Sequence, residues 1–175
     1  MNQEMIEGIR EGIRGFRLPR YEQIPSVGLY LEQTVQYINE CLAAVNQEEI
    51  TGSMISNYVK RGLLDNPVKK QYSREQIAYL IFIALAKNVL SMENLRLMIS
   101  VQRKTYTPQR AYDYLCSEFE NLLEYVFGIK ESIDTIGVDH TEEKIMLRSA
   151  IVTVAHKVYL DKLFDAMQQE SKAEA

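Results

Sequence analysis

The sequence is poor in the residues that build special sites or interrupt helices. Its 175 residues contain no tryptophan, two cysteines, four prolines and eight glycines. Because Cys41 and Cys116 lie far apart in the chain, they cannot form a CxxC redox pair or a local metal knuckle. We interpret them as reduced, buried thiols in a cytosolic protein. The scarcity of glycine and proline leaves long uninterrupted segments, which predicts an all-α fold.

Long apolar runs are missing as well. The longest, Ile77 to Ala86, has ten residues, whereas a membrane-spanning helix needs about twenty, so this run predicts a buried core helix. The N-terminus carries Glu4, Glu7 and Glu11 and no apolar stretch, which is unlike a secretory signal. We therefore expect a cytoplasmic protein that does not contact membranes.

Motifs of catalysis and cofactor binding are also absent from the sequence. It has no glycine-rich phosphate loop and no nucleophile elbow. His140 and His156 are sixteen residues apart and have no cysteine or histidine at ligand spacing. The neighbouring Glu142 and Glu143 are more typical of a helix start than of an acid/base pair. We expect no enzyme activity, no metal site and no cofactor.

What the sequence does contain is segregated charge. The formal net charge is -4, but residues 1–50 carry -4, residues 51–110 carry +7 and residues 111–175 carry -7. A basic block between two acidic blocks predicts a local anion-binding face on a protein that is acidic elsewhere.

Capping residues and apolar spacing predict the positions of the helices. Residues 1–20 place isoleucines at helical spacing but also contain three glycines, which predicts an amphipathic arm that is ordered only when docked. Residues 65–72 contain Pro67 and are expected to form a turn or short hairpin. The remaining helices are expected over about 26–46, 51–61, 73–87, 91–104, 108–127 and 140–170.

The basic block contains the most informative segment. In the helix expected over 51–61, apolar residues lie toward one side, and serine, asparagine and lysine recur on the other. Such a helix suits the DNA major groove, where asparagine pairs with adenine and lysine or arginine with guanine or phosphate. A basic turn behind it would contact phosphates. The predicted DNA contacts are Ser53, Ser56, Asn57, Lys60, Arg61, Lys69, Lys70, Gln71, Tyr72 and Arg74.

Each of these elements alone would be an ordinary polar surface. Their order, a short helix, a glycine stop at Gly62, a basic turn and a capped apolar helix, resembles the MerR-type winged helix-turn-helix. The matching residues are Tyr58, Gly62, Leu63, Tyr72, Ser73 and Ser91. The chain, including the Leu18–Tyr21 entry, is also similar to an uncharacterised Gram-positive bacterial family, a domain of unknown function with a MerR-like core. Ser56 departs from the MerR pattern, which usually has a DNA-contacting arginine there.

The resemblance implies a fold and a function. The fold is a MerR-like winged helix-turn-helix core with a C-terminal helical extension or bundle. Residues 1–20 would be the arm, 21–105 the DNA-binding domain, and 106–175 a helical dimerisation or effector region. The function would be that of a sequence-specific transcriptional regulator on double-stranded DNA, with a small-molecule effector left open. The alternative is a helical protein-interaction adaptor that keeps the core without binding DNA, which Ser56 and the negative net charge favour.

The helix expected over 140–170 has a broad apolar surface. Such a surface suggests contact with the core on one side and with another helix on the other. An intramolecular bundle and a homodimer both fit this pattern, and we favour the homodimer because two-fold DNA readers commonly pair two half-sites. The apolar residues form two adjoining rows, Leu147, Ile151, Ala155 and Val158, and Val152, Tyr159 and Leu163.

Overall fold

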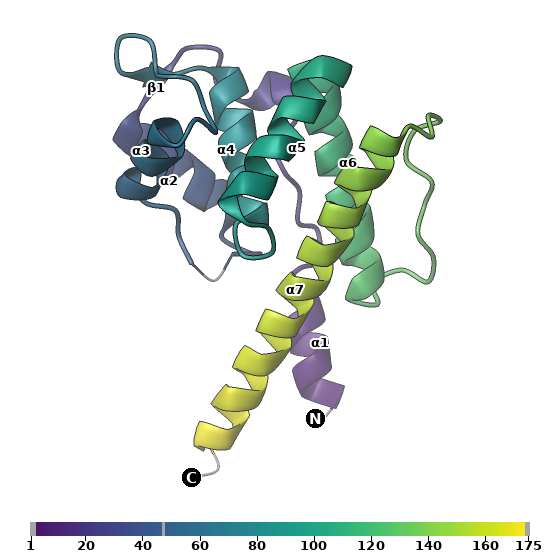
Figure 1. The fold of residues 1–175 in the computed structure, drawn as a ribbon. Helices are drawn as coiled ribbons and strands as arrows, with labels where there is room; N and C mark the ends of the chain where they lie inside the picture. Colours follow the sequence, from purple (N-terminus) through teal and green to yellow (C-terminus); the bar gives the residue numbers. More distant parts are fainter. Residues whose placement is uncertain (1–2, 47, 174–175) are drawn as a thin grey trace.

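The computed structural model describes residues 3–46 and 48–173, so that residues 1–2 of the expected arm and 174–175 of the expected C-terminal region lie outside it. The described chain is mostly helical, with one small two-stranded sheet (Figure 1), which confirms the all-α prediction. The elements are α1 (Gln3–Glu11), the 3-10 turn η1 (Tyr21–Gln23), β1 (Leu29–Tyr30), α2 (Leu31–Leu42), α3 (Gly52–Lys60), β2 (Gln71–Tyr72), α4 (Arg74–Ala86), α5 (Met92–Thr105), α6 (Pro108–Val126) and α7 (Glu142–Ala173).

Side-chain caps fix where the central helices begin. The first backbone N–H groups of a helix lack intrahelical acceptors, and a hydroxyl oxygen at the N-cap accepts from one of them. Four helices, α3 to α6, begin in this way, at Thr51, Ser73, Ser91 and Thr107. The cap of α7 is Thr141, whose hydroxyl accepts from the Lys144 N–H at 3.3 Å.

The expected helix over 26–46 is shorter than predicted. It begins at Leu31 because the two residues before it form β1, which pairs antiparallel with β2 in the register Leu29 to Tyr72 and Tyr30 to Gln71. Gly28 permits this close pairing: a Cβ at that position would lie 2.7 Å from the Cβ of Gln71. The sheet thus ties the start of α2 to the segment that follows α3.

The hydrophobic core is built around α4. Most of its residues are buried, because α2, α5, α6 and α7 all pack against it. A single cluster of buried side chains runs from Ile13 to Val158. It includes residues from all three regions expected from the sequence, 1–20, 21–105 and 106–175. The boundaries expected at residues 20 and 105 therefore lie within one shared core.

The two ends of the chain lie side by side. Figure 1 shows α1 beside the C-terminal half of α7, where both helices extend below the rest of the molecule, and α1 packs against α7. The arm is docked by specific bonds as well: Arg10 donates to the carbonyl of Phe127 at 3.1 Å, and Arg20 donates to both carboxylate oxygens of buried Glu120 at 2.7 and 2.8 Å.

Candidate nucleic-acid interface

Helix α3 presents a polar face to solvent and an apolar face to the core. Ile55 and Tyr58 are buried, while Ser53, Ser56, Asn57 and Lys60 are all exposed. Arg61, at the C-cap, is also exposed and donates to the Asn57 side-chain oxygen at 3.4 Å. Asn57 keeps its amide N–H groups on the same face, so the helix offers both donors and acceptors.

The polar face of α3 borders an open depression that it shares with α2. The depression is lined by Leu31, Glu32 and Val35 from α2 and by the outward residues of α3 together with Thr51. A Cβ at Gly52 would lie 3.2 Å from Leu31, which shows how closely the start of α3 approaches α2. Glu32 places a carboxylate here, which disfavours a phosphate at that end and can accept a hydrogen bond from a cytosine amino group.

A tight basic hairpin lies next to these two helices. Val68 and Gln71 pair across a two-residue loop, with the Gln71 N–H donating to the Val68 carbonyl at 2.9 Å. The loop residues Lys69 and Lys70 have φ angles of 50° and 65°. Two consecutive positive φ angles define the primed turn that joins twisted strands and that normally uses Asn-Gly. Non-glycine residues in this region are strained, and such strain is concentrated at functional sites.

Four cations on this surface have no acidic partner within the described chain. Lys60, Arg61, Lys69 and Lys70 are exposed and form no ion pair with any described carboxylate. The arginines of the N-terminal segment differ, because all four pair with glutamates. The positive charge of α3 and the hairpin therefore remains available to an external anion.

Two of the predicted contact residues serve the fold instead. Tyr72 is buried, so its side chain offers almost no surface to a ligand. The same burial raises the pKa of its hydroxyl. Arg74 donates to the Ile24 carbonyl at 2.8 Å and to Glu22 at 2.7 Å, and its guanidinium lies 5.6 Å from the centre of the Tyr21 ring. Both observations argue against these two side chains as DNA contacts, because Tyr72 has almost no exposed surface and the Arg74 guanidinium is already bonded within the chain.

The hairpin brings one unpredicted residue to the same surface. Tyr30 is 53% exposed and pairs across the sheet with Gln71, which is itself half-buried. Its ring and hydroxyl can contact a sugar-phosphate backbone. Sequence spacing placed Tyr30 inside a helix, and the glycine at position 28 was the one local signal of a close backbone approach.

Other kinds of site receive little support from the geometry. Across residues 3–46 and 48–173 no cluster of acidic, histidine or cysteine side chains is arranged for a metal ion. None of the described helices combines the length and hydrophobicity needed to cross a bilayer. Both cysteines are free, and burial raises the pKa of the Cys116 thiol to about 12, which suppresses the thiolate form.

An apolar cavity of about 60 Å³ lies among α4, α5, α6 and α7. Tyr79, Tyr106 and Tyr112 contribute aromatic lining. An engineered cavity that binds benzene has about 150 Å³, so a ligand of that size would require side chains to move. The cavity therefore does not assign a small-molecule effector to the protein.

The fold and this surface define a mostly helical protein that carries unpaired positive charge on a short helix and an adjoining β-hairpin. The chain belongs to the family DUF1836, described as a domain of unknown function, whose model matches residues 19–115. The match begins at Pro19 and ends within α6, so it includes α3, the hairpin and α5 but not α7. No curated protein matches the chain. No solved structure matches it either.

Proposed function

We propose that this protein is a sequence-specific DNA-binding transcriptional regulator with a MerR-like winged helix-turn-helix core. In this proposal α2 and α3 form the helix-turn-helix pair, α3 enters the major groove, and the hairpin at Lys69 and Lys70 is the wing. The observation that carries the proposal is the set of four exposed cations, Lys60, Arg61, Lys69 and Lys70, that form no ion pair with a carboxylate of the described residues.

The two parts of the surface have different roles. Ser56 and Asn57 sit on the exposed face of α3, where an asparagine amide can form two hydrogen bonds with adenine and so select sequence. Lys60, Lys69 and Lys70 would neutralise phosphates, which adds affinity that falls as salt concentration rises. The acidic C-terminal block would be repelled by DNA and would orient the basic face toward it.

The test is a fluorescence-anisotropy titration of genomic DNA fragments with the full-length protein at several salt concentrations. The double substitution Lys69→Ala/Lys70→Ala should weaken binding about tenfold or more and reduce the slope of log affinity against log salt by about two. The matched control, Lys162→Ala/Lys172→Ala on α7, removes the same charge far from the hairpin and should leave the slope unchanged. Asn57→Ala should reduce the preference for one fragment over another.

The adaptor alternative predicts a different result. The wild-type protein would then bind no fragment even at low salt, and the two double variants would behave alike. Either finding would overturn the DNA-binding proposal.

A further inference from the structure

Helix α7 carries apolar side chains on two opposite faces. One face packs against the body, where Ile151, Val154 and Val158 are buried and Tyr159 meets Phe127 edge to face with ring centres 5.2 Å apart. The opposite face is open to solvent, yet it includes large apolar side chains whose exposed fractions are 38% for Met146, 42% for Leu160, 52% for Phe164 and 44% for Met167.

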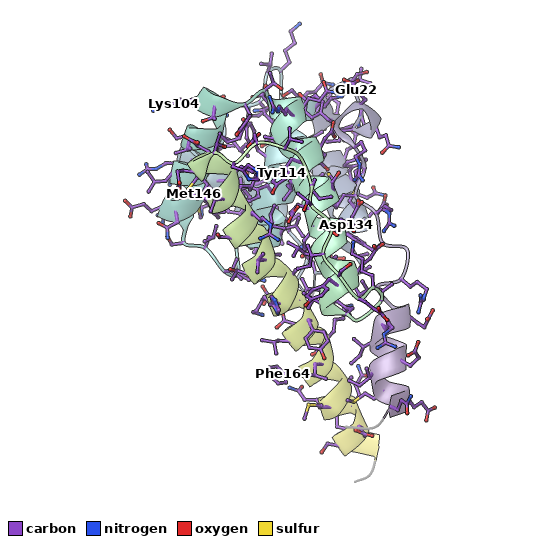
Figure 2. All side chains as sticks on the ribbon, turned by 90° about the vertical axis from the view of Figure 1, so that its right-hand side faces the viewer. Glu22, Lys104, Tyr114, Asp134, Met146 and Phe164 are labelled. Carbon is purple, nitrogen blue, oxygen red and sulfur yellow. The ribbon has the colours of Figure 1, made fainter. Side chains whose placement is uncertain are left out.

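The N-terminal arm does not cover this second face. In the C-terminal half of α7 the half-buried residues, among them Lys162, Leu163 and Ala166, follow one side of the helix, and α1 packs against α7 in this region. Leu160, Phe164 and Met167 lie on a different side and are exposed. Figure 2 shows Phe164 on the side of α7 turned away from α1, and Met146 near the other end of the helix.

The exposed row has the spacing of a helix-pairing seam. Its members are separated by steps of three, four, three, four, four and three residues, whose mean is the 3.5-residue repeat of two helices that wind around each other. The row consists of Met146, Ser149, Thr153, His156, Leu160, Phe164 and Met167.

The row is self-complementary when a second copy runs antiparallel to it. In the register that places His156 opposite Lys157 of the second copy, the large side chains nearest the centre, Leu160 and Phe164, each meet a small side chain of the other copy. Leu160 faces Thr153, Phe164 faces Ser149, and the outer pair is Met167 with Met146. In a parallel pair each residue would instead face its own counterpart. Phe164 would then meet Phe164, and the small side chains Ser149 and Thr153 would leave gaps between the two helices.

The two hydroxyl groups within the row already have hydrogen-bond partners in the same chain. The Ser149 hydroxyl donates to the Ile145 carbonyl and the Thr153 hydroxyl donates to the Ser149 carbonyl, each at 2.9 Å. These residues can therefore place carbon atoms against a partner without losing a hydrogen bond. Lys157, beside the centre of the row, pairs with Asp161, which offsets the repulsion between the two copies' lysines.

The length of α7 supplies enough contact area. Its 32 residues extend about 48 Å, and with a face about 10 Å wide the two copies would bury about 1,000 Å² in total. That is about the area at which a specific interface becomes stable. We infer that the solvent face of α7 binds the same face of a second copy of this chain, in antiparallel orientation, to form a homodimer.

The first test measures mass. Wild-type protein should have twice the 20.3 kDa chain mass in light scattering coupled to size-exclusion chromatography. Leu160→Glu and Phe164→Glu should each raise the dimer dissociation constant at least about 30-fold. Leu97→Glu, at an exposed leucine of α5, should leave the dimer intact. Far-ultraviolet circular dichroism confirms that each variant is folded; a monomeric wild type, or folded variants that remain dimeric, would overturn the inference.

The second test measures orientation in a background without the native cysteines, Cys41→Ser/Cys116→Ala. Protein with Met146→Cys mixed with protein with Met167→Cys should give a crosslinked heterodimer with a short bismaleimide. Met167→Cys alone should give none, because antiparallel copies place these positions about 30 Å apart. Efficient crosslinking of Met167→Cys alone would show a parallel pair and would contradict the register. Neither test depends on whether the protein binds DNA.

Discussion

At the scale of single residues, Glu120 connects the N-terminal segment to α6. It is buried on α6, where its carboxylate accepts from the Leu18 N–H at 2.9 Å and from both terminal nitrogens of Arg20. The hydrogen bond from Arg20 to Glu120 raises the pKa of the guanidinium, so Arg20 stays charged beside this carboxylate. Such paired geometry satisfies a buried carboxylate that would otherwise be costly.

Replacing Glu120 should therefore destabilise the protein strongly. Glu120→Ala leaves the Leu18 N–H and the Arg20 guanidinium without their acceptor, and we expect the free energy of unfolding to fall by about 2–3 kcal/mol. The control is Glu124→Ala, because Glu124 pairs at 2.9 Å with an exposed Arg17 and should contribute less than about 1 kcal/mol. Urea unfolding followed by circular dichroism measures both; equal losses would contradict this account of Glu120.

At the scale of secondary-structure elements, the hairpin loop holds its two lysines in a backbone conformation that is unfavourable for non-glycine residues. Lys69 and Lys70 both have positive φ, a region in which each non-glycine residue costs about 1 kcal/mol or more. Asparagine and glycine would fit the same backbone with less strain. If the lysines contact phosphates, the loop gives up stability in order to bind.

The variant Lys69→Asn/Lys70→Gly separates the effect of backbone strain on stability from the effect of the lysine charges on DNA binding. We expect the free energy of unfolding to rise by about 1–2 kcal/mol, while DNA affinity falls as in Lys69→Ala/Lys70→Ala. The alanine pair removes the same charge but keeps a Cβ at both positions, so it should not gain this stability. Urea unfolding and anisotropy titrations of both variants provide the comparison, and an unchanged stability of the Asn-Gly variant would show that the loop is not strained.

At the scale of the whole molecule, the segments share one hydrophobic core. Helix α4 packs against α2, α5, α6 and α7, and the cluster of buried side chains extends from Ile13 to Val158. A fragment containing only residues 21–105 would expose the parts of α4 that α6 and α7 cover, with a large loss of buried apolar area.

Full-length protein should therefore unfold in urea in one transition, with coincident curves from circular dichroism and tyrosine fluorescence. The 21–105 fragment should show no cooperative transition and should bind a hydrophobic dye. Two separate transitions in the full chain, or a fragment as stable as the whole, would show that the expected boundary at residue 105 divides independent domains.

The positions of the helices were largely predictable because their signals are local. Caps at Ser73, Ser91 and Thr107 act on backbone groups three residues away, so a short window contains the necessary information. The exposed residues of α3 were predictable for the same reason, since a helix separates its two faces every three or four residues. The strand at Leu29 and Tyr30 was not, because its partner lies about forty residues further along the chain.

The sequence by itself determined the helices, the basic block and the polar face of α3, since these depend on residues that are neighbours in the chain. Only the tertiary structure decided that Tyr72 is buried, that Arg74 is paired with Glu22 and that Tyr30 is exposed beside the hairpin. The physical reason is that burial and ion pairing depend on which distant segments pack together. The same packing covers one face of α7 and leaves Leu160, Phe164 and Met167 open to solvent.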